Sequence, residues 1–164
     1  FDRETRTVTF NGVSTQYINN TADAQGSEFY NFTISNTSGI SLNANVTVTN
    51  TFTFNANGLV TLNAYNFNLS SGASGSISGN NATRYFITNS TGALQRTVNA
   101  TGTVYNFPVG DAANYTLATV NFDAGVTFAA ASVAAVATPA ITSGLPILLI
   151  SSTKKSVIFS HSFG

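Results

Sequence analysis

The sequence predicts an all-β protein that begins with a short β-solenoid and continues as a small β-sandwich. Apolar residues alternate with Thr, Ser or Asn through most of the chain, which is the period of half-buried strands. Asn, Gly and Ser gather between the apolar runs, where their backbone preferences favour turns. A stretch of about 20 residues also occurs twice in succession, as in solenoid repeats.

The repeat aligns residues 32–50 (FTISNTSGISLNANVTVTN) with residues 52–71 (FTFNANGLVTLNAYNFNLSS). With a one-residue deletion in the second copy, the predicted matches are Phe32 with Phe52, Ile34 with Phe54, Gly39 with Gly58, Ile40 with Leu59, Leu42–Ala44 with Leu62–Ala64, and Val46 and Val48 with Phe67 and Leu69. One such unit is too small to bury its own apolar face. Stacked copies cover one another, which is the principle of a parallel β-helix-like solenoid.

Weaker copies flank this pair. Residues 7–20 show the same alternation, and Phe10 stands 22 residues before Phe32. Residues 75–98 supply either a further coil or a departure from the pattern. We therefore expect solenoid coils over residues 1–90. The alternative fold is an ordinary antiparallel sandwich built from hairpins, because Thr- and Asn-rich β-proteins also resemble themselves by chance.

After Arg96 the repeat fades, and the rest is expected to form a sandwich-like region over residues 91–164 that could be incomplete. The strand-like runs in it are residues 101–110, 114–122, 125–136, 145–151 and 155–163. Pro108 cannot donate a backbone hydrogen bond, so its strand is expected to be an edge strand or to end there. In the last run Val157, Phe159 and Phe163 share one face with His161, and no closing hairpin is visible.

Composition excludes several classes of protein. Charged residues make up 7% of the chain and the net charge is zero, and the six Lys and Arg residues are scattered, so no nucleic-acid surface is expected. Cysteine is absent, which excludes disulfides and thiolate sites. No apolar stretch approaches the roughly 20 residues that a membrane span needs. Because the chain begins without Met, we interpret it as a processed chain or a piece of a longer one.

Few residues are suited to catalysis. The acidic residues are Asp2, Glu4, Asp23, Glu28, Asp111 and Asp123, and the repeat over residues 32–71 has no charged residue. A β-helical lyase or hydrolase needs clustered carboxylates or bases, so we expect no enzyme and predict no catalytic, cofactor-binding or metal-binding residue. His161, the one histidine, is expected to be structural. Asp111 alone offers too few oxygen ligands for Ca²⁺.

Asparagine is unusually frequent, with 20 residues, of which nine stand in N-x-S/T motifs: Asn19, Asn31, Asn36, Asn45, Asn68, Asn81, Asn89, Asn99 and Asn114. Glycosylation is one interpretation. The favoured one is that these residues form ladders and turns at the corners of a solenoid. The six tyrosines could stack on sugars, but they are expected mostly in the core or at strand ends.

Several phrases occur together in one order: TVTFNG, FYNFTISNTSGISLNANVTVTNTFTFNANGLVTL, GSISGNNATRYFITNSTGALQRTV and YNFPVGDAANYTLATVNF. The order and composition of these phrases resemble the repetitive β-helix and β-sandwich regions of Bacteroidetes secreted or cell-surface proteins that the type IX secretion system exports. The resemblance extends from about Thr7 to Val157. Residues 31–49 and 107–122 carry the most specific part. The sequence departs from the family where Thr138-Pro139 and SVIFSHSF stand in place of a His-Pro pair and an Asn-Arg-Tyr-Trp run, and the family's C-terminal sorting domain is not expected within these 164 residues.

The resemblance implies an adhesin-like or structural role, as in gliding-motility adhesins, and an extracellular location at the cell surface. The expected function is a non-catalytic structural or adhesin module of a large secreted or surface-anchored protein. One alternative is a subunit of an extracellular filament assembled by strand donation, in which Val157, Phe159 and Phe163 insert into a neighbour. Another is a carbohydrate-binding or carbohydrate-active β-helix domain. Expected partners are the secretion machinery, neighbouring subunits or domains, and surface glycans, with no cofactor.

Overall fold

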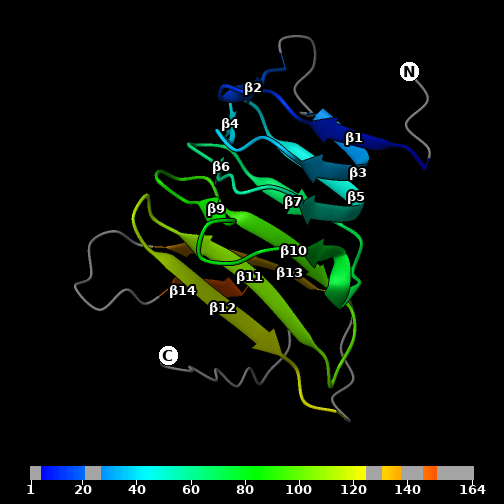
Figure 1. The fold of residues 1–164 in the computed structure, drawn as a ribbon. Helices are drawn as coiled ribbons and strands as arrows, with labels where there is room; N and C mark the ends of the chain where they lie inside the picture. Colours follow the sequence, from blue (N-terminus) through cyan, green and yellow to red (C-terminus); the bar gives the residue numbers. More distant parts are fainter. Residues whose placement is uncertain (1–4, 21–26, 125–130, 138–145, 151–164) are drawn as a thin grey trace.

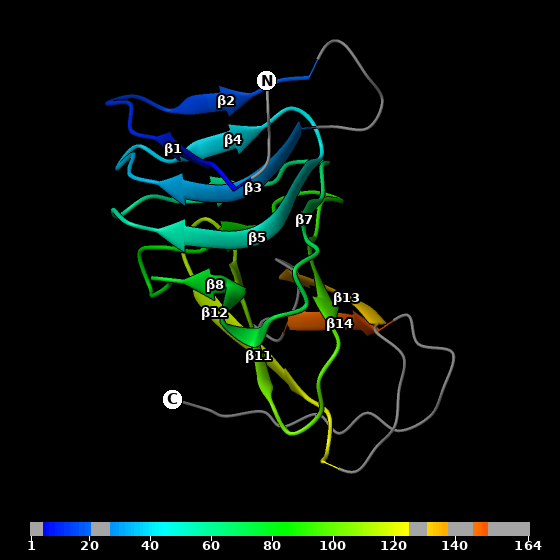
Figure 2. The same ribbon diagram turned by 90° about the vertical axis from the view of Figure 1, so that its right-hand side faces the viewer.

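The computed structural model describes residues 5–20, 27–124, 131–137 and 146–150. Two β-sheets face each other through most of this part of the chain (Figures 1 and 2). The first sheet contains β1 (Thr7–Phe10), β3 (Ser27–Ile34), β5 (Val46–Phe54), β7 (Phe67–Leu69), β8 (Ile77–Ser78), β10 (Leu94–Val98), β13 (Ala131–Ala137) and β14 (Pro146–Ile150). The second contains β2 (Gln16–Ile18), β4 (Ile40–Leu42), β6 (Val60–Thr61), β9 (Phe86–Ile87), β11 (Val104–Gly110) and β12 (Tyr115–Asn121).

From β1 to β11 the chain alternates between the two sheets, with β7 and β8 as two consecutive strands of the first sheet, so that each coil adds to both. In the first sheet β1, β3, β5, β7 and β10 pair in parallel, and in the second sheet β2, β4, β6, β9 and β11 do the same. This is a β-solenoid of about four turns, as the repeat predicted. The alternative of an antiparallel sandwich of hairpins is wrong for this part of the chain.

The strand register confirms most of the predicted matches. Phe32 pairs with Phe52 and Ile34 with Phe54, whereas Val46 and Val48 pair with Phe67 and Leu69. The predicted one-residue deletion is wrong, because Ile40 pairs with Val60 and Ser41 with Thr61. The first coil is also displaced from its expected position, since Val8 rather than Phe10 pairs with Phe32 and Phe10 pairs with Ile34.

Close backbone packing at the corner between coils explains the error at Gly39. This residue has φ +74°, and a Cβ atom there would collide with the carbonyl oxygen of Leu59. Gly39 therefore packs most closely on the backbone of Leu59. Gly58 has its closest contact elsewhere in the preceding coil, since a Cβ atom there would collide with the carbonyl oxygen of Asn36 and would also lie 3.4 Å from the Cα atom of Gly39. The two glycines are needed for separate contacts, so matching them shifted the alignment.

Phenylalanine side chains form the centre of the core between the sheets. Phe32 of the second coil, Phe52 of the third, and Phe67 and Phe86 from the two sheets of the fourth are fully buried. The ring centroids of Phe32 and Phe52 are 5.6 Å apart, those of Phe52 and Phe67 are 4.9 Å apart, and those of Phe67 and Phe86 are 4.8 Å apart. These distances lie in the range that favours aromatic pairs. The stack joins the second, third and fourth coils through the interior, and in the fourth coil it also joins the two sheets.

The fourth coil departs from this regular pattern. Two short strands replace one long strand, since β7 pairs with Val46–Val48 and β8 with Phe52–Thr53 of the same neighbour, β5. Residues 70–76 leave the sheet between them and end in a 3₁₀ turn, η1 (Ser74–Ser76). The backbone of this bulge has no strand neighbour to satisfy its carbonyl groups, so other donors are needed.

Parallel stacking continues beyond residue 90, through β10 and β11. The chain then changes direction: β12 pairs with β11 in antiparallel orientation, β13 with β10, and β14 with β13. The expected boundary at residue 90 thus falls within both sheets, and the sandwich-like second region stays a prediction. Residues 151–164 lie outside the described part of the chain, and with them Val157, Phe159, His161 and Phe163.

The prediction for Pro108 is wrong, because β11 continues to Gly110 and has neighbours on both sides. Within β11, the short strand β9 pairs with Val109 and Gly110 alone, so it requires no hydrogen bond from Pro108. On the other side Pro108 lies opposite Leu117. A proline is tolerated there because the ladder uses alternate residues of the strand.

Candidate functional site

The described part of the chain brings few charged side chains together. Its carboxylates are Glu28, Asp111 and Asp123, and none of its residues forms a group of three or more His, Cys, Asp and Glu side chains suited to a metal ion. The Asp111 carboxylate accepts hydrogen bonds from the backbone N–H groups of Ala113 (2.7 Å) and Asn114 (2.8 Å) and from the Asn114 side chain. These bonds lower the pKa of Asp111, the Asn114 side chain most. Asp111 therefore fixes the turn between β11 and β12.

Side-chain amides link the coils on their outer surface, as the asparagine-ladder hypothesis predicted. Asn43 Nδ2 donates to Asn19 Oδ1 at 2.8 Å, and Asn50 Nδ2 donates to Asn31 Oδ1 at 2.8 Å. Further along, Asn89 Nδ2 donates to Asn63 Oδ1 at 3.1 Å. Each bond joins one coil to its neighbour. The ladder adds directional contacts to the parallel backbone pairing.

The buried side chain of Asn36 stabilises a corner of the solenoid through hydrogen bonds. It is fully buried, and its Nδ2 donates to the Ser14 carbonyl oxygen at 2.7 Å and to Gln16 Oε1 at 3.0 Å. Its Oδ1 accepts from the backbone N–H of Ser38 at 2.8 Å. Asn36 is also one of the nine motif asparagines, and its burial leaves no access for a glycan in the folded chain.

The other motif asparagines are mostly engaged in hydrogen bonds as well. Side-chain bonds within the described residues are made by Asn19, Asn31, Asn45, Asn81, Asn89, Asn99 and Asn114. In the part of the chain that the structure describes, Asn68 on β7 makes none. Glycosylation of these motifs stays a prediction, but structural use of asparagine is now shown at most of them.

Tyrosine side chains do not form an aligned exposed row within the described residues. Tyr85 and Tyr105 are buried, and their hydroxyl groups donate to the carbonyl oxygens of Asp111 and Gly72, both at 2.9 Å. Tyr115 packs on Tyr85 with ring centroids 5.4 Å apart. Tyr17 is 57% exposed and stands apart on β2. Most of the expected positions in the core or at strand ends are therefore confirmed.

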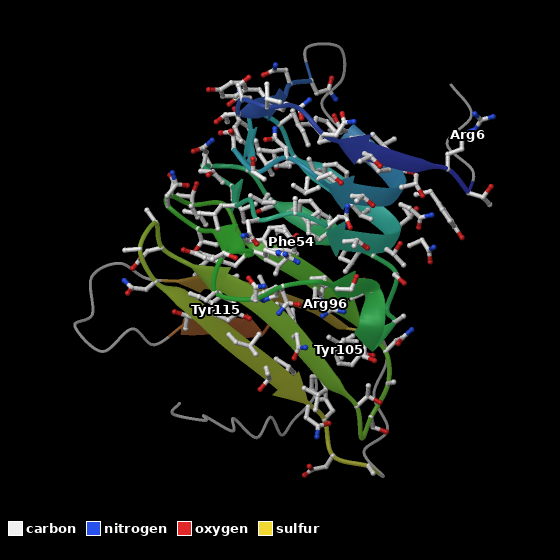
Figure 3. All side chains as sticks on the ribbon, in the orientation of Figure 1. Arg6, Phe54, Arg96, Tyr105 and Tyr115 are labelled. Atoms are coloured by element: carbon white, nitrogen blue, oxygen red, sulfur yellow. The ribbon has the colours of Figure 1, made fainter. Side chains whose placement is uncertain are left out.

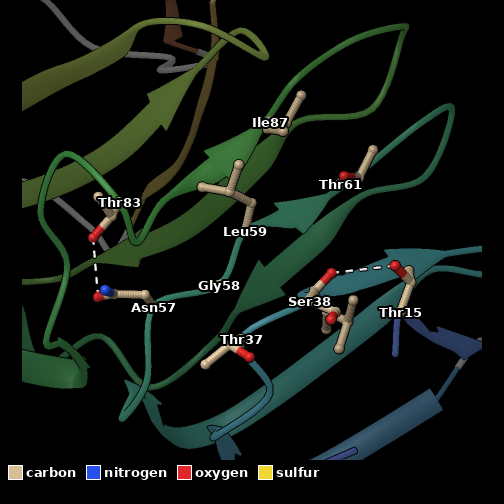
Figure 4. A pocket seen from close by; sticks show the side chains of 10 residues that line it. Thr15, Thr37, Ser38, Asn57, Gly58, Leu59, Thr61, Thr83 and Ile87 are labelled. Carbon is tan, nitrogen blue, oxygen red and sulfur yellow. Dashed lines mark hydrogen bonds between the residues drawn. The ribbon is translucent and has the colours of Figure 1, made fainter. Parts of the chain in front are cut away.

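A shallow groove crosses the corners of the first four coils (Figure 4). Its volume is about 300 Å³, and its lining residues are Thr15, Thr37, Ser38, Ile40, Asn57, Gly58, Leu59, Thr61, Thr83 and Ile87. None of these side chains is charged. Thr83 Oγ1 donates to Asn57 Oδ1 at 3.0 Å, and Thr15 Oγ1 donates to the Ser38 carbonyl oxygen at 3.2 Å. Hydroxyl and amide groups thus surround a small apolar floor.

Arg96 is the most unusual polar residue of the described chain, because its side chain is 1% exposed and lies inside the core (Figure 3). Its Nη1 donates to the Asn106 carbonyl oxygen at 2.6 Å. Its Nη2 donates to the carbonyl oxygens of Ala73 (3.0 Å) and Ser74 (2.8 Å) and to Ser76 Oγ (3.0 Å). These acceptors belong to the bulge of the fourth coil and to β11. Arg96 therefore supplies the donors that the bulge lacks.

The surroundings of Arg96 contain aromatic rings in place of a carboxylate. The guanidinium carbon lies 5.4 Å from the ring centroid of Tyr105 and 5.7 Å from that of Phe107. Burial lowers the pKa of Arg96 to about 10, and Tyr105 acts in the opposite direction. Nε has no hydrogen-bond partner. The side chain is held by neutral acceptors and ring faces, which suits a structural role.

Sequence reasoning missed Arg96, although a signal was present. In the run Leu94-Gln95-Arg96-Thr97-Val98, the alternation places Arg96 on the same inward face as Leu94 and Val98. A charged residue at an inward position indicates a buried polar network. The acceptors for that network come from residues 73–76 and 106, and their position depended on a bulge that the repeat did not reveal.

Comparison with known protein families, with curated proteins and with solved structures found no match for this chain. The described residues also contain no helix that is both long and apolar enough to cross a membrane.

Proposed function

We propose that this chain is a non-catalytic structural module, a stiff stalk segment of an adhesin-like protein at the cell surface. The observation that carries the proposal is the in-register stacking of coils, in which Phe32 pairs with Phe52 and both sheets continue from coil to coil. Each coil added to such a stack lengthens it by one strand spacing, about 4.8 Å. A stalk can therefore be extended by duplication without a new core.

The outer faces of the coils suit this role. Thr9, Thr33 and Thr53 occupy equivalent positions on three neighbouring strands, and Asn43 and Asn50 bridge to preceding coils. Uncharged hydroxyl and amide groups keep the surface polar without long-range repulsion between coils. The resemblance to Bacteroidetes proteins exported by type IX secretion supports an extracellular location, with the secretion machinery and neighbouring domains as partners.

Duplication of Phe32–Thr51 tests the stalk. Four extra copies should lengthen the folded chain by about 19 Å, at one strand spacing per coil. Small-angle X-ray scattering measures the maximum dimension, and urea unfolding checks that the chain folds. An unchanged dimension in a folded variant would contradict the proposal. The location has a separate test: an antibody against the chain should label intact cells, and labelling only after permeabilisation would contradict it.

The groove favours a second candidate function, the binding of an uncharged carbohydrate. Hydroxyl and amide groups around Leu59 and Ile87 match the chemistry of a neutral sugar. A neutral-glycan array should retain the wild-type chain, and Thr61→Trp should abolish retention by filling the groove. Thr47→Trp, on the outer face of the other sheet, is the matched control and should bind as the wild type does. Equal binding by Thr61→Trp, or none by the wild type, would contradict this candidate.

The filament alternative depends on residues outside the described part of the chain. Deleting Lys155–Gly164 tests strand donation by Val157, Phe159 and Phe163. Loss of polymer with an intact monomer supports donation, whereas an unfolded or aggregated monomer contradicts it.

A further inference from the structure

Two Asn-Gly dipeptides occur in the chain, Asn11-Gly12 and Asn57-Gly58, and both lie at the corner where the chain passes from the first sheet to the second. Both asparagines are exposed, so solvent reaches each of them. Because glycine has no Cβ atom, its backbone nitrogen approaches the side-chain amide of a preceding asparagine without steric hindrance. Each dipeptide is therefore a candidate for asparagine deamidation, and its surroundings decide whether it reacts.

The two glycine nitrogens differ in their hydrogen bonding. The N–H of Gly12 donates to Gln16 Oε1 at 2.8 Å, and this bond is lost if the nitrogen gives up its proton. The N–H of Gly58 makes no hydrogen bond within residues 5–20, 27–124, 131–137 and 146–150. Deprotonation of Gly58 therefore sacrifices no bond to the described chain, and its nitrogen is the better nucleophile of the two.

The two side-chain amides differ as well. Asn57 Oδ1 accepts a hydrogen bond from Arg84 Nε at 2.9 Å and another from Thr83 Oγ1 at 3.0 Å, the second of which Figure 4 shows. Arginine is only a donor, which identifies the accepting atom of Asn57 as the amide oxygen. Such donors stabilise the negative charge that develops on a carbonyl oxygen when a nucleophile adds to its carbon. The side chain of Asn11 has no such donor among the described residues.

Packing keeps the reactive dipeptide in the chain and suits its product. A Cβ atom on residue 58 would collide with the carbonyl oxygen of Asn36, so the stacking of the third coil on the second requires glycine there. Arg84 forms no ion pair with any described residue. A carboxylate at residue 57 would place an anionic oxygen where a neutral one already accepts from this cation, which strengthens the bond. The corner therefore accommodates an aspartate at this position.

We propose that Asn57 is a deamidation site, at which the folded chain promotes the reaction that it suppresses at Asn11. The Gly58 nitrogen loses its proton to a solvent base and attacks Asn57 Cγ. The new C–N bond closes a succinimide ring, the bond from Cγ to Nδ2 breaks, and Nδ2 takes up a proton and leaves as ammonia. Water then opens the ring to aspartate or isoaspartate, with no change of oxidation state.

The consequence is one negative charge in a groove whose lining residues are otherwise uncharged. Asn57 lies in that lining, beside Gly58 and Leu59 (Figure 4). The net charge of the chain falls from zero to minus one. This inference depends on neither the stalk function nor carbohydrate binding.

Peptide mass spectrometry of the 164-residue chain, stored folded at mildly alkaline pH, measures the deamidated fraction at each asparagine. Asn57 should react at least about tenfold faster than Asn11, the rate difference that one hydrogen bond in the transition state supplies. In guanidinium chloride both dipeptides lose their surroundings, and the two rates should become similar. Equal rates in the folded chain, or a difference that persists in guanidinium chloride, would overturn the inference.

Two variants test the donors to Asn57. Arg84→Met removes the Nε donor, and Thr83→Val removes the hydroxyl donor but keeps Arg84. Each should slow deamidation at Asn57 and leave the rate at Asn11 unchanged. Asn57→Gln is the matched control: it keeps an amide at this position, but its longer side chain forms a cyclic imide much more slowly, so the main acidic species in isoelectric focusing should disappear. An unchanged rate at Asn57 in both donor variants, with cooperative unfolding retained, would also overturn the inference.

Discussion

The fourth coil satisfies its backbone hydrogen-bonding groups in a different way from the regular second and third coils. In the regular coils, long strands pair residue by residue, and alternation of apolar and polar side chains is sufficient, as in the pairing of β3 with β5. In the fourth coil the pairing is divided between β7 and β8, and the bulge of residues 70–76 exposes carbonyl groups to the core. A buried cation, Arg96, satisfies them. A solenoid thus tolerates an insertion when a later coil supplies donors.

Removal of the Arg96 guanidinium should have the largest effect. Arg96→Met keeps most of the apolar stem but removes the guanidinium donors to the carbonyl groups of Ser74 and Asn106, whereas the Ala73 carbonyl keeps its bonds from Ser76. The free energy of unfolding should fall by about 3–5 kcal/mol, as when one side of a buried polar network is removed. Urea unfolding measures the change. Arg84→Met, at a half-buried side chain that bonds Asn57 Oδ1, should cost about 1 kcal/mol or less. Equal losses for both variants would contradict the account.

The next largest change in the free energy of unfolding depends on pH and involves Tyr85 of the fourth coil. Burial, and to a smaller extent the charge of Asp111, raises the pKa of Tyr85 above its usual value of 10.0. The folded chain therefore holds this proton at a pH where the unfolded chain releases it. The stabilisation is fully present below pH 10 and is lost as the pH rises through the higher folded pKa.

Comparison of the wild type with Tyr85→Phe isolates this contribution. The variant should lose about 1 kcal/mol at pH 8, because Tyr85 no longer donates to the Asp111 carbonyl oxygen. The difference between the two chains should shrink as the pH rises above 10. Both chains contain Arg96, whose lowered pKa makes stability change with pH in the opposite direction. Subtracting one unfolding free energy from the other therefore cancels the contribution of Arg96. Parallel curves of unfolding free energy from pH 8 to 11 would exclude a raised pKa for Tyr85.

The regular coils should respond least to loss of a single polar contact. Asn43→Ala breaks the 2.8 Å bond to Asn19 on the exposed corner, and the expected loss is about 0.5–1 kcal/mol. Asn68→Ala is the matched control, because Asn68 makes no side-chain bond within the described residues, and it should stay within about 0.5 kcal/mol of the wild type. Thermal and urea unfolding compare the two. A larger loss for Asn68→Ala would contradict a stabilising role for the asparagine ladder.

Much of the regular region could be predicted from the sequence because its interactions are local in the repeat. Phe32 and Phe52 occupy equivalent positions, and the same holds for Val46 and Phe67, so one comparison of neighbouring stretches gives the register. The shift at Ile40 arose because alignment favoured matching Gly39 with Gly58, whereas backbone contacts decide where a glycine is required.

The irregular region was harder to predict for a physical reason. Its stability depends on contacts between residues that share no pattern, such as Arg96 with Ala73 and with Asn106. The pairing of β10 with β7 and of β11 with β9 continues the solenoid past the expected boundary, because parallel pairing survives a wider and less regular spacing. The groove was not foreseen either, since it combines corner residues from four separate coils.

The most direct test of the stacked-coil account is an in-phase deletion. Removing Phe32–Thr51 joins Asn31 to Phe52, and because Asn31 pairs with Thr51, the chain passes from one coil to the next without a change of phase. β2 should then pair with β6. Removing residues 32–45, a shorter deletion that does not end at paired positions, is the control. We expect the in-phase variant to unfold cooperatively in urea with a lower m-value, since less surface is buried, and the out-of-phase variant not to fold. Loss of cooperative unfolding in both variants would contradict stacking of equivalent coils.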